Sequence, residues 1–242
     1  MQTALTKMLN VPQNALHSVL APYQAKIRIL SALKKEKPLY KRKIELPNYP
    51  LTKQEKQYLF DRHFDPYALQ EQFNIQGGGY LNAWKNRIII PVYINLKLVS
   101  WVGRTILPGR EPRYKFLANE KSVINPKTFF FNLDNCSNEY VAVLEGPFDV
   151  MRFGNDSICG FGISLTRVQL MCLSERFKKI YFIFDNERQA QKKAREYAML
   201  LCGHGLDAYT VDISGYGVND VAELSPFNAR KLKKEIFNAY NN

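Results

Sequence analysis

The feature that most constrains the fold of this chain is an alternation of short apolar runs and segments of helical length, which begins after Tyr140. We expect strands at residues 140–144, near 158, at 179–184 and at 206–211, and helices from about 148, over 166–177, over 187–201 and after 226. Strands separated by helices usually form a parallel sheet covered on both faces. The sequence therefore predicts an α/β fold with a mainly parallel sheet flanked by helices.

Two helix signals precede this region. Thr52 and Glu55 have the spacing of a capping box, and Asp65 before Pro66 starts a second short helix that ends at Phe73. These signals predict a helical opening to a smaller α+β subdomain that lies before the parallel sheet in the chain.

A β-hairpin is expected next. Residues 88–94 and 98–102 are rich in β-branched side chains and flank a turn at residues 95–97. Basic and aromatic residues then alternate, as is typical of a groove that contacts a nucleic-acid backbone. They are Arg110, Arg113, Tyr114, Lys115 and Phe116.

These patterns divide the chain into three parts. Residues 1–44 form a basic helical or flexible segment, residues 45–137 the basic α+β subdomain, and residues 138–242 the parallel-sheet domain with its C-terminal helix. The basic run in the first part is equally compatible with a solvated arm and with nucleic-acid contact.

The charge balance favours a polyanionic partner. Lys and Arg total 34 against 22 Asp and Glu, a net charge of +12, and nucleic acid is the usual partner of such a basic chain. Charge alone leaves an ordinary soluble basic protein equally open.

No structural zinc is expected, because the cysteines and histidines are too scattered to form a zinc ribbon. They are Cys136, Cys159, Cys172, Cys202, His17, His63 and His204. The sequence also shows no apolar run of about 18 residues and no secretion signal. We therefore expect a cytoplasmic protein with no membrane partner.

Acidic residues follow the expected strands of the parallel sheet. Glu145 follows the first strand, Asp185 and Glu187 follow the strand at 179–184, and Asp220 lies in the loop after the last. Reactive groups gather at the carboxyl ends of parallel strands, and acids that converge there are best neutralised by hard cations. This pattern predicts a two-metal Mg²⁺ or Mn²⁺ site.

Asp149 has two equally open interpretations. It lies four residues after Glu145, so a helix that begins near Pro147 would bring it back toward the same acids. It could instead satisfy free amides at the start of that helix.

Two segments resemble the signatures of the Toprim fold, which bacterial-type primases and topoisomerases share. The segment 143–150 (VLEGPFDV) resembles the first, and 184–187 (FDNE) the second. The stretch 160–166 (GFGISLT) is similar to the connection between these signatures in primases.

The resemblance extends upstream in the manner of DnaG-type DNA primases and covers about residues 50–225. Residues 87–104 resemble the hairpin of the primase basic subdomain, 114–117 (YKFL) its template-tracking motif, and 130–133 (FFNL) its lead into the Toprim strand. The resemblance implies a primase core that makes short RNA primers on single-stranded DNA from ribonucleoside triphosphates. The compactness of the chain suggests that a phage or plasmid encodes it and that it acts in the cytoplasm of a bacterial or phage-infected cell.

The resemblance also assigns residue roles. It implies Glu145, Asp185 and Glu187 as catalytic metal ligands, with Asp149 and Asp220 as supporting acids. The polynucleotide or nucleotide contacts that it implies are Arg87, Arg104 and Lys115, and Arg113 replaces Lys115 if the alignment shifts by two residues.

Two departures from the family pattern bear on activity. Glu187 stands where the family has a second aspartate, and residues 189–191 (QAQ) replace an expected Ala-Gly pair. The zinc ribbon and the helicase part of such primases are also not evident in the sequence. We therefore expect one of three outcomes. The chain depends on a separate zinc-bearing subunit or a replicative helicase, it starts primers without strict template preference, or it has lost independent initiation.

Two other functions stay open beside the primase. A Toprim nuclease would use the same metal ions to activate water. A non-catalytic replisome subunit would bind single strands through the basic groove without turnover.

Overall fold

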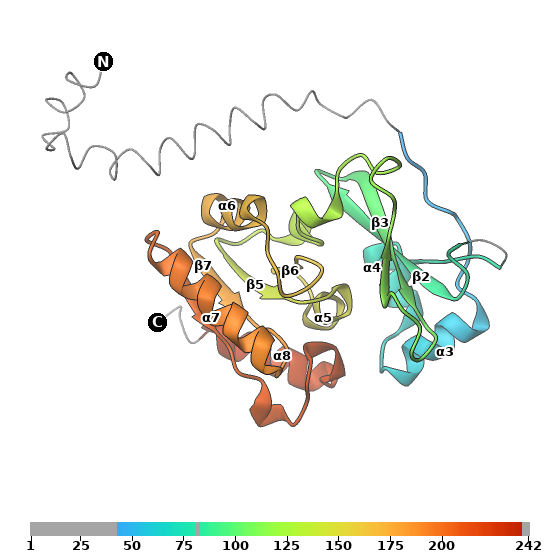
Figure 1. The fold of residues 1–242 in the computed structure, drawn as a ribbon. Coiled ribbons are helices and arrows are strands. Elements are labelled where there is room, and N and C mark those ends of the chain that lie inside the picture. The colour runs from blue at the N-terminus through green and yellow to red at the C-terminus, as the bar shows by residue number, and fades with distance from the viewer. Residues whose placement is uncertain (1–42, 81–82, 239–242) are drawn as a thin grey trace, which may run out of the picture. The chain divides into compact units, whose positions relative to one another are not determined.

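The computed structural model describes residues 43–80 and 83–238 (Figure 1). The predicted N-terminal segment, apart from its last two residues, lies outside these ranges. None of the helices within them is long and apolar enough to cross a membrane.

The first part of the described chain has two helices and an antiparallel sheet, ordered β1-β2-β3-β4. Its elements are α3 (Lys53–Asp61), α4 (Pro66–Phe73), β1 (Gln76–Gly77), β2 (Arg87–Ile94), β3 (Lys97–Thr105) and β4 (Tyr114–Phe116). Both predicted caps are present: Thr52 and Glu55 exchange hydrogen bonds with each other's backbone amides, and Asp65 accepts from the amides of Tyr67 and Ala68. The predicted helical opening is thereby confirmed.

Strand β1 is not expected from the sequence, because glycine has low strand propensity. At Gly77 an added Cβ would lie 2.3 Å from the carbonyl oxygen of Pro50, and at Gly78 it would lie 1.9 Å from that of Trp84. These glycines therefore allow two backbone segments to approach closely.

The second sheet is parallel throughout, with strand order β6-β5-β7-β8. Its strands are β5 (Tyr140–Leu144), β6 (Ser157–Cys159), β7 (Lys179–Phe182) and β8 (Asp207–Thr210), and its helices are α5 (Pro147–Phe153), α6 (Arg167–Arg176), α7 (Arg188–Cys202) and α8 (Pro226–Asn238). Four short 3₁₀ helices, η1 (Pro126–Thr128), η2 (Leu133–Asn135), η3 (Ser214–Tyr216) and η4 (Val221–Glu223), lie in the connections. The predicted α/β class and parallel sheet are confirmed.

Alternate residues of β5 face two different cores. Ala142 and Leu144 belong to a core shared with α5 and α8, whereas Val141 and Val143 belong to one shared with α6 and α7. The first of these cores also contains residues of α3, α4, β2 and β3. Residues from both sheets thus share one continuous apolar core.

Arg152 of α5 joins the helical opening to the parallel-sheet part. Its guanidinium donates to the carbonyl oxygens of Arg62 (2.7 Å) and His63 (3.0 Å) and lies 4.0 Å from the centre of the Phe64 ring. The end of α3 is thereby fixed beside α5.

The β2–β3 turn is tighter than the sequence indicates. Asn95 and Leu96 form a two-residue connection with φ of 51° and 61°, and Lys97 already pairs with Ile94. The Asp134 carboxylate accepts hydrogen bonds from both turn amides, at 3.0 and 2.8 Å.

This turn generates a stability prediction. Leu96 is 86% exposed and has the left-handed backbone that favours glycine, so Leu96→Gly should raise the free energy of unfolding by about 0.5–1 kcal/mol, as measured by urea denaturation. Leu107→Gly, at an exposed position without positive φ, is the control and should not stabilise. A lower free energy of unfolding for Leu96→Gly would contradict the prediction.

Candidate active site

Loops that carry the predicted acids meet at the carboxyl edge of the parallel sheet. Glu145 follows β5 directly, Asp185 and Glu187 lie between β7 and α7, and Asp220 precedes η4 after β8. Because β5, β7 and β8 run parallel, these loops emerge at the same edge.

Hydrogen bonds hold the loops together. The backbone amide of Asp185 donates to Oε1 of Glu145 at 2.9 Å, and the amide of Asn186 donates to the carbonyl oxygen of Asn219, also at 2.9 Å. The first bond joins the ends of β5 and β7, and the second brings the Asp220 loop beside them.

Gln191 fixes the loop that carries Asp185 from the other side. Its side-chain Nε2 donates to the carbonyl oxygens of Phe184 (2.9 Å) and Asp185 (3.1 Å). This residue belongs to the segment that departs from the primase pattern, and its side chain bonds the loop directly.

Asp149 is buried and has two backbone partners. Its Oδ2 accepts from the amide of Gly146 at 2.9 Å, and its Oδ1 accepts from the amide of Ala222 at 3.0 Å. The interpretation as an acid that satisfies free amides at a helix start agrees with this geometry. Asp220 similarly accepts from the amide of Glu223 at 2.9 Å.

The acids perturb one another strongly. Burial, followed by repulsion from neighbouring carboxylates, raises the pKa of Asp185 to about 7. Burial likewise raises the pKa of Glu145 to about 7, with added repulsion from Asp149, Glu187 and Asp220, although the bond from the Asp185 amide opposes the rise. Asp149 also reaches about 7, mainly through burial. Acids that interact this strongly are a frequent mark of a functional site.

The chemistry of these side chains fits a hard divalent cation, since all are carboxylates and a positive charge would relieve their repulsion. Within residues 43–80 and 83–238, however, no three acidic, histidine or cysteine side chains have the arrangement of a preformed metal site. Glu145 and Asp185, both half-buried, are the ligand candidates best placed for one, and Glu187 is exposed nearby.

Arginines line the same cavity as the acids. The cavity has a volume of about 190 Å³ and brings Arg62, Arg104 and Arg113 together with Glu145, Asp149, Asp185 and Asp220. Positive and negative groups from both parts of the described chain therefore face one space.

Arg104 is 7% exposed, and its guanidinium lies 5.0 Å from the centre of the Tyr114 ring and 5.7 Å from that of Phe148. Arg62 lies 5.9 Å from the Phe148 ring centre. Among the described atoms, the Nε of each arginine is buried without a hydrogen-bond partner. Each guanidinium therefore has one buried N–H that no described atom satisfies, in a side chain that lines the cavity.

The other predicted nucleic-acid contacts lie differently. Arg87 is 2% exposed and donates to the carbonyl oxygen of Gly103 at 2.9 Å, a packing position with no surface for a polynucleotide. Lys115 donates to the carbonyl oxygen of Ala83 at 3.0 Å and lies outside the lining of the acidic cavity. Arg113 lines that cavity, so the geometry favours the shifted assignment.

The sequence indicated no site role for Arg62, Phe148 or Phe161 and placed Tyr114 only in the predicted basic groove, yet all four line the cavity. The resemblance to primases, which begins near residue 50, covers Arg62 but gave it no role. Periodicity could not place the aromatic residues there, because their approach depends on contacts between α3, β4 and the parallel-sheet part.

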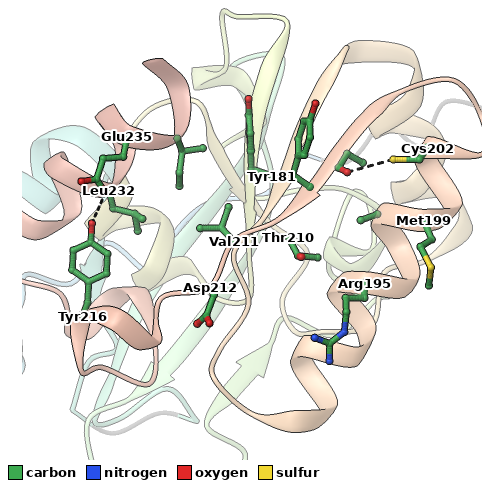
Figure 2. Close-up of a pocket in the computed structure, with 14 residues that line it drawn as sticks. Tyr181, Arg195, Met199, Cys202, Thr210, Val211, Asp212, Tyr216, Leu232 and Glu235 are labelled. Carbon is green, nitrogen blue, oxygen red and sulfur yellow. Dashed lines mark hydrogen bonds between the residues drawn. The ribbon is translucent and has the colours of Figure 1, made fainter. Parts of the chain in front are cut away.

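A larger groove lies elsewhere, at the open edge of β8 between α7 and α8 (Figure 2). It has a volume of about 760 Å³ and is lined mainly by apolar side chains. Its acids have local partners: Glu235 accepts from the Tyr216 hydroxyl at 2.7 Å, and Asp212 accepts from the Ser214 amide at 2.8 Å (Figure 2 labels the first pair). The predicted acids converge with arginines at the smaller cavity and not in this groove.

Comparison with known sequences points to DNA primases, although no protein-family profile matches the chain. The chain is 30% identical over 130 residues to a DNA primase of Synechococcus elongatus, and the aligned region covers 49% of this chain and 18% of the relative. It is 27% identical over 148 residues to one from Synechocystis, covering 54% of this chain and 23% of the relative. The chain thus spans about a fifth of the length of these curated relatives.

Solved structures show the same fold. The Aquifex aeolicus primase, with zinc-binding and RNA polymerase domains, matches with a TM-score of 0.61 and 18% identity over 78% of this chain and 55% of its own. A DnaG primase catalytic domain bound to single-stranded DNA matches with a TM-score of 0.60 and 18% identity over 79% and 72%. The chain therefore has the fold of the DnaG primase catalytic core, and its resemblance to DnaG-type DNA primases is confirmed.

Proposed function

We propose that this chain is the catalytic core of a DNA primase, a nucleotidyltransferase that joins ribonucleoside triphosphates into short RNA primers on single-stranded DNA. The observation that carries the proposal is the cavity in which three arginines face four carboxylates within a DnaG-core fold. We place this activity in the cytoplasm.

In this proposal Glu145 and Asp185 hold Mg²⁺ or Mn²⁺, with Glu187 as a further ligand from the exposed loop. Bound divalent ions would supply charge neutralisation at the attacking and leaving oxygens. Gln191 and the Asp185 amide keep the two principal carboxylates in position. Asp149 and Asp220 support the site by fixing the α5 and η4 loops.

The arginines take the phosphate groups. Arg104 and Arg62 are held against aromatic rings, and each has one buried N–H without a partner among the described atoms. Arg113, directly before β4, lines the same cavity. Guanidinium groups bind phosphate oxygens in a planar, two-pronged geometry. A triphosphate in this cavity would thus lie between the arginines and the carboxylates.

The non-catalytic alternative has one observation in its favour, the lack of a preformed three-ligand site in the described residues. It predicts salt-sensitive binding of single strands without product. The nuclease alternative predicts metal-dependent cutting of the template without nucleotide. A zinc-bearing subunit or a replicative helicase remains the partner that we predict if the chain alone is inactive.

Loss of a carboxylate tests the proposed chemistry. Asp185→Ala should lower primer synthesis on mixed-sequence single-stranded DNA at least 100-fold, because the substitution removes both a negative charge and a principal metal ligand. Product is measured with labelled ATP or GTP and Mg²⁺ or Mn²⁺. Asp207→Ala, an exposed acid of β8, is the control and should retain activity. Synthesis by Asp185→Ala at the wild-type rate would contradict the site.

Arg113→Ala tests the phosphate contact. Since Arg113 is exposed, its loss should leave the melting temperature unchanged while raising the KM for nucleotide about tenfold through a lost charge-assisted hydrogen bond. Arg230→Ala on α8 is the matched exposed control. Equal KM values for Arg113→Ala and wild type would exclude this residue from nucleotide binding.

The raised pKa values predict a pH-dependent stability. A carboxyl with a raised pKa binds its proton more tightly in the folded state than in the unfolded state. Its stabilising contribution to the free energy of unfolding is therefore fully present below about pH 4 and is lost as the pH rises through about 7. In metal-free buffer at pH 8, Asp185→Asn should therefore be more stable than wild type, by about 1 kcal/mol after solvent screening.

Thermal unfolding with and without Mg²⁺ provides the measurement. A ligand that binds only the folded state raises the melting temperature. Because wild type keeps the Asp185 carboxylate, Mg²⁺ should raise its melting temperature more than that of Asp185→Asn. A variant that is less stable than wild type at pH 8 without metal would contradict repulsion at this site.

A further inference from the structure

We propose that the ring of Phe161 is a stacking surface for a nucleobase at the mouth of the arginine–carboxylate cavity. This inference rests on the proposed function, because it specifies how the same cavity would hold the base of a nucleotide or of a template strand. The ligand chemistry is the flat aromatic face that every nucleobase has.

The backbone at Phe161 is unusual for a bulky residue. Phe161 has φ of 61°, in the left-handed region that glycine and asparagine favour. Gly160 and Gly162 lie on either side, and Gly162 itself has φ of 130°. A glycine at 161 would avoid the steric cost of this conformation, so the chain retains an aromatic side chain where the backbone disfavours one.

The neighbours of Phe161 hold its ring at the cavity. The ring lies edge-on to Phe116 of β4, with centroids 5.5 Å apart, and is tilted against Phe131 at 6.3 Å. The residue stays only partly buried and lines the cavity. The ring is therefore supported from behind while part of it remains accessible.

The stacking surface is tied to the acids and aligned with the arginines. The amide of Gly162 donates to the backbone carbonyl oxygen of Glu145 at 2.8 Å, so the Phe161 loop is fixed beside the residue that carries the first carboxylate. Along β4, Phe116 beside Phe161 is two residues from Tyr114, which lies against Arg104. Side chains two apart on a strand share a face, so the aromatic and guanidinium groups follow one another along the same surface.

A nucleotide could therefore place its phosphates at Arg104 and its base at Phe161. Phe148 and Tyr114 also line the cavity, but Phe148 is 3% exposed and the Arg104 guanidinium lies over the ring of Tyr114. Among the aromatic residues that line this cavity, Phe161 has the ring best available to a ligand.

The test compares ligands with and without a base on the full chain. Affinities of ATP and of base-free ribose 5′-triphosphate are measured by calorimetry for wild type, Phe161→Leu and Phe161→Trp. Leucine keeps the apolar contact and the same backbone cost but has no aromatic face. Phe161→Leu should weaken ATP about tenfold, leave ribose 5′-triphosphate unchanged, and be rescued by Phe161→Trp. The Trp variant should also show fluorescence quenching by ATP that ribose 5′-triphosphate does not produce.

A second arm identifies the source of the base. Affinities of oligo(dT) and of an abasic oligonucleotide of equal length are compared in the same way. If Phe161→Leu loses the preference for oligo(dT) over the abasic strand alone, Phe161 stacks on a template base. If it loses the preference for ATP over ribose 5′-triphosphate alone, Phe161 stacks on the base of the nucleotide. Phe227→Leu, an exposed ring on α8, is the matched control.

Three results would overturn the inference. Equal weakening of base-containing and base-free ligands would assign Phe161 a structural or phosphate-related role, and unchanged affinities in Phe161→Leu would exclude stacking. In both cases wild-type binding of ATP or oligo(dT) would leave the proposed function standing. A wild-type chain that binds none of the ligands would overturn the proposed function together with the stacking surface.

Discussion

The contact between the ends of β5 and β7 is the constraint on which the rest of the site depends. The amide of Asp185 donates to the Glu145 carboxylate, which fixes two acids beside each other although their charges repel. Burial and repulsion together raise the pKa of both to about 7. The fold tolerates this arrangement because Gln191 holds the Asp185 loop by its carbonyl groups. A bound cation would reduce this repulsion.

The arginine side of the cavity depends on contacts between the two sheets. Arg152 fixes the end of α3 against α5, so Arg62, the next residue after α3, reaches the cavity. Phe148 of α5 contacts both Arg62 and Arg104. The same packing that joins the two parts of the chain therefore also positions the cationic groups opposite the acids.

Local signals predicted the elements well, whereas contacts distant in sequence escaped prediction. The capping residues Thr52 and Asp65 marked two helix starts correctly, and the strand–helix alternation predicted the parallel sheet and which acids lie at its carboxyl edge. The burial of Arg87 was not predictable, because it depends on pairing between β2 and β3 and on Gly103. The left-handed backbone of Phe161 likewise has no signature in a single sequence, since propensity would place glycine there.

Proton release on metal binding tests whether the carboxylates with raised pKa values form a cation site at this sheet edge. Mn²⁺ is titrated into the full chain by calorimetry at pH 6.5 and pH 8.5, in buffers with different ionisation enthalpies. We expect saturable Mn²⁺ binding that releases protons at pH 6.5, releases few at pH 8.5 and is weakened in Glu145→Gln. Absence of Mn²⁺ binding, or binding with no proton release at pH 6.5 and no change in Glu145→Gln, would contradict it.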